Sequence, residues 1–444
     1  MDKHEKFIKL TTGRIERLVC EFAVPSIICM VISALYNIID TYFVGKINTQ
    51  STAALGIVFS YMTMIQAVSF FFGHGSGNFI SRALGAQKTD EAATMGATGF
   101  FSALITSSII AILCGIFIEP VLYIFGSTPT IMPYAKEYFM YILLGTPFIS
   151  GVFAMNNQMR LQGNAAMSAI GIMTGAILNI ILDPILIFKF NMGISGAGLA
   201  TAISQFVSFV IMLKMIGKNG GIAIKLQNFR PTVGRFAEIF AGGSPSLLRQ
   251  CLMGVASIFL NNYASQYGDT AVAAFSVATR VMMFSTAVLL GFGQGYQPVC
   301  GFNFGAKLFD RVNYGFRFST IVATIYCFIF SIVGIIFAHE IVTIFSSNDA
   351  EVIEIGTIVL KYHCYSFTLN GFIILANMYL QNTRRTTSAI ILATARQGLF
   401  FVPVLCLCAN CGGLYGIIIS QPISDILTFI VAIPLCKKAM REAQ

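Results

Sequence analysis

Long apolar runs recur along the whole chain and restrict it to a helical fold that crosses a membrane. About 20 apolar residues cross a bilayer as a helix, and backbone groups in lipid must find their hydrogen bonds within the segment. Of the 444 residues, 56% are hydrophobic and 11% are charged, too few charges for a soluble chain of this length. The sequence predicts an all-α integral membrane protein with twelve transmembrane helices, at roughly 17–44, 52–81, 92–118, 131–155, 165–188, 195–216, 236–263, 271–301, 312–337, 352–379, 387–408 and 413–435.

Basic residues gather in alternate loops, which predicts how the chain is oriented. One set of loops carries nearly all of the lysines and arginines, including Arg82, Arg160 and Arg384, whereas the other set carries little beyond Lys46 and Lys189. Basic loops stay on the cytoplasmic side. We therefore expect a multi-pass protein of the cell membrane with both termini in the cytoplasm, and we read the net charge of +9 as this bias rather than as a sign of nucleic-acid binding.

The chain repeats itself with a constant shift of 220 residues. Pro25-Ser26 recurs as Pro245-Ser246, Gly85-Ala86 as Gly305-Ala306, and Gly193 as Gly413. The repeat predicts two pseudo-symmetric lobes of six helices, related by an axis along the membrane normal. We place the N-terminal lobe at 1–217, a cytoplasmic linker at 218–235 and the C-terminal lobe at 236–444.

One carboxylate, Asp40, interrupts the first apolar run, between Leu18 and Val44. An acid at the centre of a membrane helix costs roughly 2.5–3.5 kcal/mol and usually marks a functional site. Asp40 precedes Lys46 by six residues, and Asp183 precedes Lys189 by six, so both lie about 9 Å inside the outer ends of their helices.

Two further polar residues reach the same depth in the first lobe. Asn179 lies one turn before Asp183, and Thr201 lies a similar distance inside the next helix. Two carboxyl groups in a poorly hydrated pocket would share one proton, or they would bind Na⁺ through their oxygens. The ion would then reshape the first helix at a hinge near Pro25. The alternatives are structural roles for Asp40, and for Asp183-Pro184 as a helix cap or kink.

The second lobe carries different buried charges. Arg249, Arg396 and Asp425 lie near mid-membrane by their distance from the helix ends, and Arg280 lies about as far from its outer end. A buried arginine needs a counter-ion, and Asp425 is the acid at that depth. We expect either a structural ion pair or a role in substrate recognition or gating.

Three sequence motifs resemble the MATE (multidrug and toxic compound extrusion) family, in particular its MepA-like bacterial branch. They are YNIIDTYFVG around Asp40, the run from Gly73 to Gln87, and its counterpart from Gly293 to Ala306. The resemblance implies a drug exporter in which two lobes alternate between inward and outward access. It also implies that Asp40, Asn179, Asp183 and Thr201 are the ion site of the first lobe.

The expected substrates are cationic or amphipathic organic compounds exchanged for H⁺ or Na⁺. Tyr36, one turn before Asp40, is placed to stack on a cation. It forms the expected substrate cleft with Asn37 and Gln66. No cofactor or metal is expected, the expected partners are these organic compounds and the lipid bilayer, and a monomer would suffice.

Other classes of protein are less consistent with the residues. A flippase for lipids or lipid-linked oligosaccharides of related architecture is the main alternative, and it often has extra spans and a more basic cleft. The cluster Cys406, Cys408 and Cys411 has no nearby histidine to complete a zinc site. No nucleophile-base pair or phosphate loop indicates an enzyme.

Overall fold

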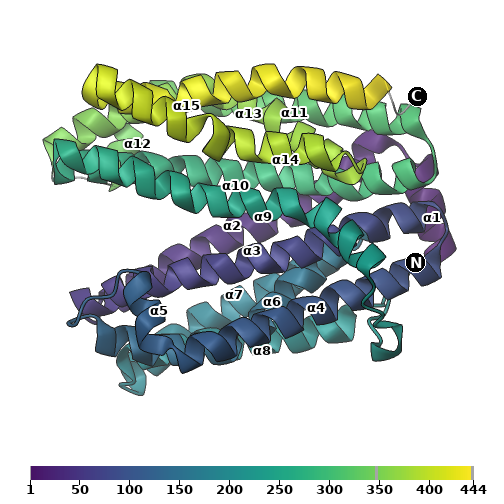
Figure 1. The fold of residues 1–444 in the computed structure, drawn as a ribbon, viewed down its shortest axis with the longest axis horizontal. Helices are drawn as coiled ribbons and strands as arrows, with labels where there is room; N and C mark the ends of the chain where they lie inside the picture. The colour runs from purple at the N-terminus through teal and green to yellow at the C-terminus, as the bar shows by residue number, and fades with distance from the viewer. Residues whose placement is uncertain (1, 346–348, 442–444) are drawn as a thin grey trace. The chain divides into compact units, whose positions relative to one another are not determined.

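The computed structural model describes residues 2–345 and 349–441, and within them the chain forms helices and connecting turns without a strand (Figure 1). The α-helices are α1 (Lys3–Thr12), α2 (Ile15–Gly45), α3 (Thr49–Gly85), α4 (Thr89–Ile116), α5 (Ile118–Ile124), α6 (Met132–Leu161), α7 (Ala165–Pro184), α8 (Gly193–Met215), α9 (Val233–Ala264), α10 (Asp269–Gly305), α11 (Phe309–Ile336), α12 (Ala338–Phe345), α13 (Ala350–Asn382), α14 (Thr386–Thr394) and α15 (Phe401–Arg441). Two π-helical turns, η1 (Ile185–Lys189) and η4 (Ala395–Leu399), and two 3₁₀ turns, η2 (Leu226–Asn228) and η3 (Ser265–Tyr267), complete the chain.

Ten helices among the described residues are long and apolar enough to cross a membrane. One of them, at 386–441, contains two of the expected spans. Gly413, whose backbone is not helical (φ 58°, ψ −138°), separates these two spans. Helix α9 holds the remaining expected span, although Ser244, Arg249 and Gln250 dilute its apolar character. The all-helical membrane fold predicted from the sequence is confirmed.

The chain packs into two compact units. Unit 1 contains 1–13 and 28–247, and unit 2 contains 14–27 and 248–444. Helices α2 and α9 therefore each contribute to both units, and each division falls two residues after a proline inside the helix, Pro25 or Pro245. The sequence-derived boundaries of the lobes and of the linker stay a prediction.

The 220-residue repeat is visible in the helix bounds. Helices α3 and α10 both have 37 residues, α4 and α11 both have 28, and each pair starts 220 residues apart. The left-handed backbone positions repeat as well, with Gly193 (φ 57°) matching Gly413 and Gln87 (φ 60°) matching Lys307 (φ 62°). Two stretches of different sequence thus adopt one backbone path.

Equivalent helices form the centre of each unit. Helix α6 packs against α3, α4, α7 and α8 in unit 1, whereas its counterpart α13 packs against α10, α11 and α15 in unit 2, as can be followed in Figure 1. Small residues bring helices close together in membranes. A Cβ atom at Gly151 would lie 2.4 Å from the Phe209 ring, and one at the equivalent Gly371 would lie 2.8 Å from the Thr324 backbone.

We predict that Gly416→Ala destabilises the protein and that Gly412→Ala does not. A Cβ atom at position 416 would lie 1.8 Å from the Cys408 carbonyl oxygen, whereas one at 412 meets nothing within 4 Å. Overpacking of this kind costs about 1–3 kcal/mol or more. The thermal unfolding midpoint in detergent is expected to fall for Gly416→Ala alone, and equal midpoints for the two variants would contradict the close approach.

Helix α1 is fixed to unit 1 by a buried lysine. Its start carries a capping box between Asp2 and Glu5. Lys6 is 2% exposed, and its Nζ donates to Asn164 Oδ1 at 2.7 Å. Burial, and then the charge of Lys9, lower the pKa of Lys6 from 10.5 to about 8.

The lowered pKa predicts that docking of α1 strengthens with pH. Undocked α1 keeps the Lys6 proton up to its ordinary pKa, whereas docked α1 releases it at lower pH, so the docked state gains stability as pH rises from about 8 to about 10 and is unaffected below that window. Hydrogen exchange of α1, corrected for its intrinsic rate, is expected to slow across the window. In Lys6→Met this dependence should vanish, and an unchanged dependence would rule out Lys6 as its source.

Candidate functional site

Two carboxyl groups meet inside unit 1. Asp40 comes from α2 and is 7% exposed, and Asp183 comes from the end of α7 and is fully buried. The two groups lie within hydrogen-bonding reach of each other. Asp40 Oδ1 and Asp183 Oδ1 are both buried without a hydrogen-bond donor from the described residues. Two carboxylates this close repel each other in a site with little water, so a proton or a cation between them would stabilise the contact.

The Asn179 amide holds Asp183 in place, and Thr201 holds Asn179. In the orientation of the Asn179 side chain that satisfies both of its ends, Nδ2 donates to Asp183 Oδ2 at 3.0 Å. Asn179 Oδ1 then accepts from the backbone N and Oγ1 of Thr201, each at 3.2 Å. Both residues are 1% exposed. The structure therefore brings together the four residues that were expected to converge.

Two tyrosines enlarge the site. Tyr36 and Tyr138 each lie within hydrogen-bonding reach of Thr201 and close enough to Asp40 and Asp183 to interact electrostatically. The sequence reasoning did not include Tyr138. It lies six residues into α6, so the depth estimate used for the other residues would have found it. Gly198 permits the close approach, since a Cβ atom there would lie 3.1 Å from the Tyr138 carbonyl oxygen.

Helix irregularities lie next to the acid pair. Asp183 precedes Pro184, which ends α7, and the π-helical turn η1 follows directly. Single π-turns occur often at functional sites. On α2, Pro25 lacks the amide hydrogen that a continuous helix needs at that position. The interrupted hydrogen bonding in α2 therefore lies two residues before position 27, where the helix passes from unit 2 to unit 1.

The residues expected in the substrate cleft are partly separated from the acid pair. Tyr36 is half-buried and belongs to the site, and Gln66 on α3 is also half-buried. Asn37 is exposed, and its Nδ2 donates to the Ser33 carbonyl oxygen one turn earlier. Contact of these three residues with a substrate stays a prediction.

Three of the four charges expected in the second lobe come together in unit 2. Asp425 on α15 is 1% exposed and accepts from Arg396 Nε at 2.9 Å. Arg249 on α9 is half-buried and interacts electrostatically with Arg396. The expected burial of Arg280 is wrong, because this residue is exposed on α10. Distance along a helix predicts depth but does not predict the face on which a side chain lies.

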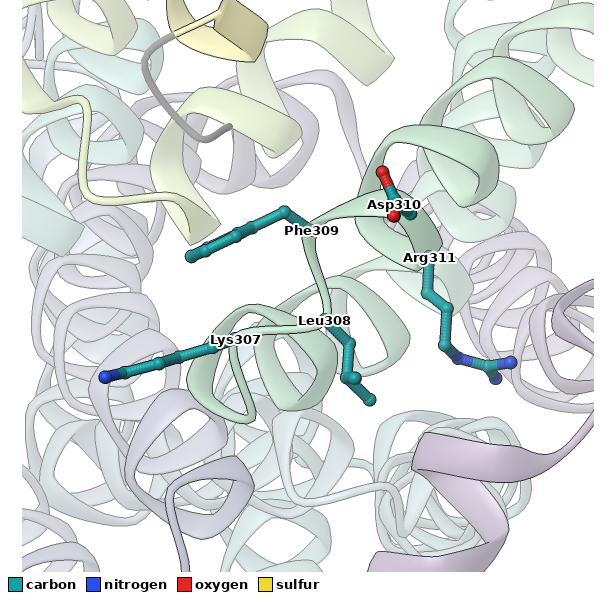
Figure 2. Close-up of a pocket in the computed structure, with 5 residues that line it drawn as sticks. All are labelled: Lys307, Leu308, Phe309, Asp310 and Arg311. Atoms are coloured by element: carbon teal, nitrogen blue, oxygen red, sulfur yellow. The ribbon is translucent and has the colours of Figure 1, made fainter.

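Two pockets of unit 2 lie away from these charges. A pocket of about 400 Å³ lies at the turn between α10 and α11, and Figure 2 shows Lys307 and Arg311 in its lining pointing away from each other. A neighbouring pocket of about 420 Å³ shares Asp310 and Arg311 with it and adds Arg14 and Glu16. Because these side chains do not converge, we do not assign the functional site here.

The repeated bundle of membrane-length helices, with an acid pair buried inside one repeat, is the architecture of a two-repeat membrane transporter. The MatE family model matches residues 25–185 and 245–407, one segment in each repeat. The chain belongs to the MatE family, and the expected resemblance to MATE transporters of the MepA type is confirmed.

The similarity to known proteins covers nearly the whole chain. The chain is 29% identical over 435 residues to the multidrug export protein MepA of Staphylococcus haemolyticus, covering 97% of this chain and 95% of that protein. It is 27% identical over 442 residues to MepA of Staphylococcus aureus, with the same coverage. The fold matches the outward-facing conformation of a multidrug resistance MATE family transporter, with a TM-score of 0.92, 24% identity and 98% of each chain covered.

We predict that Asn179→Ala destabilises unit 1 more than Asn37→Ala does. Removal of the Asn179 amide leaves Asp183 Oδ2 buried without this donor, which costs about 1–3 kcal/mol. Asn37→Ala removes an exposed amide of the same size on α2. Thermal unfolding in detergent compares the two variants, and an Asn179→Ala protein as stable as Asn37→Ala would show that the amide does not support the acid.

Proposed function

We propose that this protein exports cationic or amphipathic organic compounds across the cell membrane, in exchange for H⁺ bound at the acid pair of unit 1. The relatives named MepA support the multidrug part of this proposal. The observation that supports the coupling part is the buried contact between Asp40 and Asp183, which a bound proton would stabilise. We also propose that both termini lie in the cytoplasm and that the protein acts as a monomer.

The acid pair would couple the ion to the position of α2. With one proton between them, Asp40 and Asp183 attract each other, which ties α2 to α7. When the proton leaves, two adjacent carboxylates repel each other in a site with little water, and α2 is pushed away. Helix α2 would bend at Pro25, where its backbone hydrogen bonding is interrupted.

Alternating access would follow from this movement. A proton that enters from outside closes the contact between α2 and α7 and drives the organic substrate out. Release of the proton on the inner side reopens the site for the next substrate. Na⁺ is the alternative coupling ion, because the same carboxylate, amide and hydroxyl oxygens are ligands that hard cations accept.

The proposal predicts that Asp40→Asn and Asp183→Asn abolish uphill transport. Purified protein in proteoliposomes is given an imposed pH gradient or an Na⁺ gradient, each alone, while ethidium movement is followed by fluorescence. Each asparagine removes the charge change on one acid, so neither variant can cycle a proton at the pair. Asp90→Asn, an exposed aspartate at the start of α4, is the matched control and should transport like the unchanged protein.

The two gradients separate the possible outcomes. Uphill movement with the pH gradient, lost in both site variants, supports proton antiport. Movement with Na⁺ alone keeps the antiporter and changes the ion. Full transport by folded Asp40→Asn contradicts the coupling role, and absence of movement with either gradient in the unchanged protein favours the lipid flippase.

A further inference from the structure

Unit 2 contains a second charged cluster, which the acid pair does not use. It comprises Arg249 on α9, His363 on α13, Arg396 in the π-helical turn η4 and Asp425 on α15. Arg249 and His363 lie near the middle of long helices. The cluster is therefore remote from both membrane surfaces, where the lipid head groups are.

The only acid of this cluster is fully occupied by donors. Asp425 Oδ1 accepts from Arg396 Nε at 2.9 Å and from Gln421 Nε2 at 3.0 Å. Asp425 Oδ2 accepts from Ser366 Oγ at 2.8 Å and from Asn370 Nδ2 at 3.3 Å. With four donors on its two oxygens, Asp425 is held in place by Arg396 and its neighbours and is not free to neutralise a second arginine.

Arg249 is the charge without a counter-ion. It forms no hydrogen bond or ion pair with any residue that the structure describes, and the charge that it senses most is the like charge of Arg396. Two guanidinium groups and one carboxylate leave an excess positive charge in the middle of a membrane protein. Such a charge is costly unless water or an anion balances it.

The turn that carries Arg396 packs against the helix that carries Arg249. A Cβ atom at Gly398 in η4 would lie 2.8 Å from the Leu252 side chain, so this turn packs directly on α9, one helical turn from Arg249. Ser424 Oγ donates to the Arg396 carbonyl oxygen at 2.8 Å and fixes the same turn from α15. The Arg396 side chain keeps 21% of its surface exposed, and Arg249 is also only half-buried.

We propose that Arg249 and Arg396 form a binding site for the carboxylate group of a zwitterionic organic substrate. Guanidinium groups bind carboxylates through charge-assisted and often bidentate hydrogen bonds. Arg396 uses Nε for Asp425, and its terminal nitrogens remain for a ligand. A bound carboxylate would balance the excess positive charge. Arg249 would in turn offset the free-energy cost of moving that carboxylate out of water.

This inference rests on the proposed export function and narrows its substrate class. A transporter that recognises only cations has no means of stabilising a carboxylate within the membrane. The arginine pair would extend the range to molecules that carry an amine and a carboxylate together. A lipid phosphate is a poorer fit, because the cluster lies far from the head groups.

The test compares two dyes that differ in a single charge. Rhodamine B is a zwitterion with a free carboxylate, and its methyl ester is a cation of nearly the same shape. Binding of each to the purified full-length protein is measured by fluorescence anisotropy. The unchanged protein should bind rhodamine B more tightly than the ester. In Arg249→Gln the Kd for rhodamine B should rise about ten- to a hundredfold, and the Kd for the ester should rise far less.

Two further variants keep the test decisive. Arg249→Lys retains the charge without the guanidinium fork and should restore part of the preference for rhodamine B. Arg317→Gln makes the same substitution at an exposed arginine of α11 and should leave the preference unchanged. Should Arg249→Gln not fold, the preference of the unchanged protein for rhodamine B over the ester still decides the proposal.

The outcomes separate this proposal from the proposed function. Equal affinity for the two dyes in the unchanged protein, or an equal loss for both in Arg249→Gln, overturns the carboxylate site and leaves ethidium export untouched. Loss of ion-driven ethidium transport in the unchanged protein would instead remove the export function itself.

Discussion

Two carboxyl groups in contact within a membrane protein cannot both be ionised without a large electrostatic cost, and the organisation of unit 1 follows from this constraint. Asp183 is fixed by Asn179, which Thr201 fixes in turn, whereas Asp40 is carried by the helix that contains Pro25. One acid is thus held firmly and the other lies on a segment that is able to bend. Gain or loss of one proton therefore changes the force between a fixed acid and one on a helix that is able to bend.

The two repeats share a backbone path but contain different charged groups, an acid pair in unit 1 and two arginines with one acid in unit 2. The 220-residue shift takes Asp40 to Leu260, Asn179 to Leu399 and Asp183 to Pro403, so the acid pair has no counterpart in unit 2. The same shift takes Thr201 to Gln421, which donates to Asp425. Gln421 bonds to its acid directly, whereas Thr201 bonds to Asn179, which in turn donates to Asp183. The π-helical turns, η1 after Asp183 and η4 around Arg396, also lie beside the charged groups of both units.

The sequence predicts how deep a residue lies along its helix, because a lysine marks the helix end and each residue adds a constant rise. This reasoning grouped Asp40, Asn179, Asp183 and Thr201 correctly. It did not predict which way a side chain points, because helices that are apolar on all sides carry no amphipathic signal. Arg280 was therefore expected to be buried and is exposed. The π-helical turns were not predicted either, since only Pro184 gave a local indication of one.

The division of α2 and α9 between the two units has a consequence for how the chain can be cut. A break between the repeats would leave each fragment with a helix end that belongs to the other unit's packing, residues 14–27 on one fragment and part of α9 on the other. Neither half would be a complete folding unit by itself. Separate expression of the two repeats would therefore lose packing in both units.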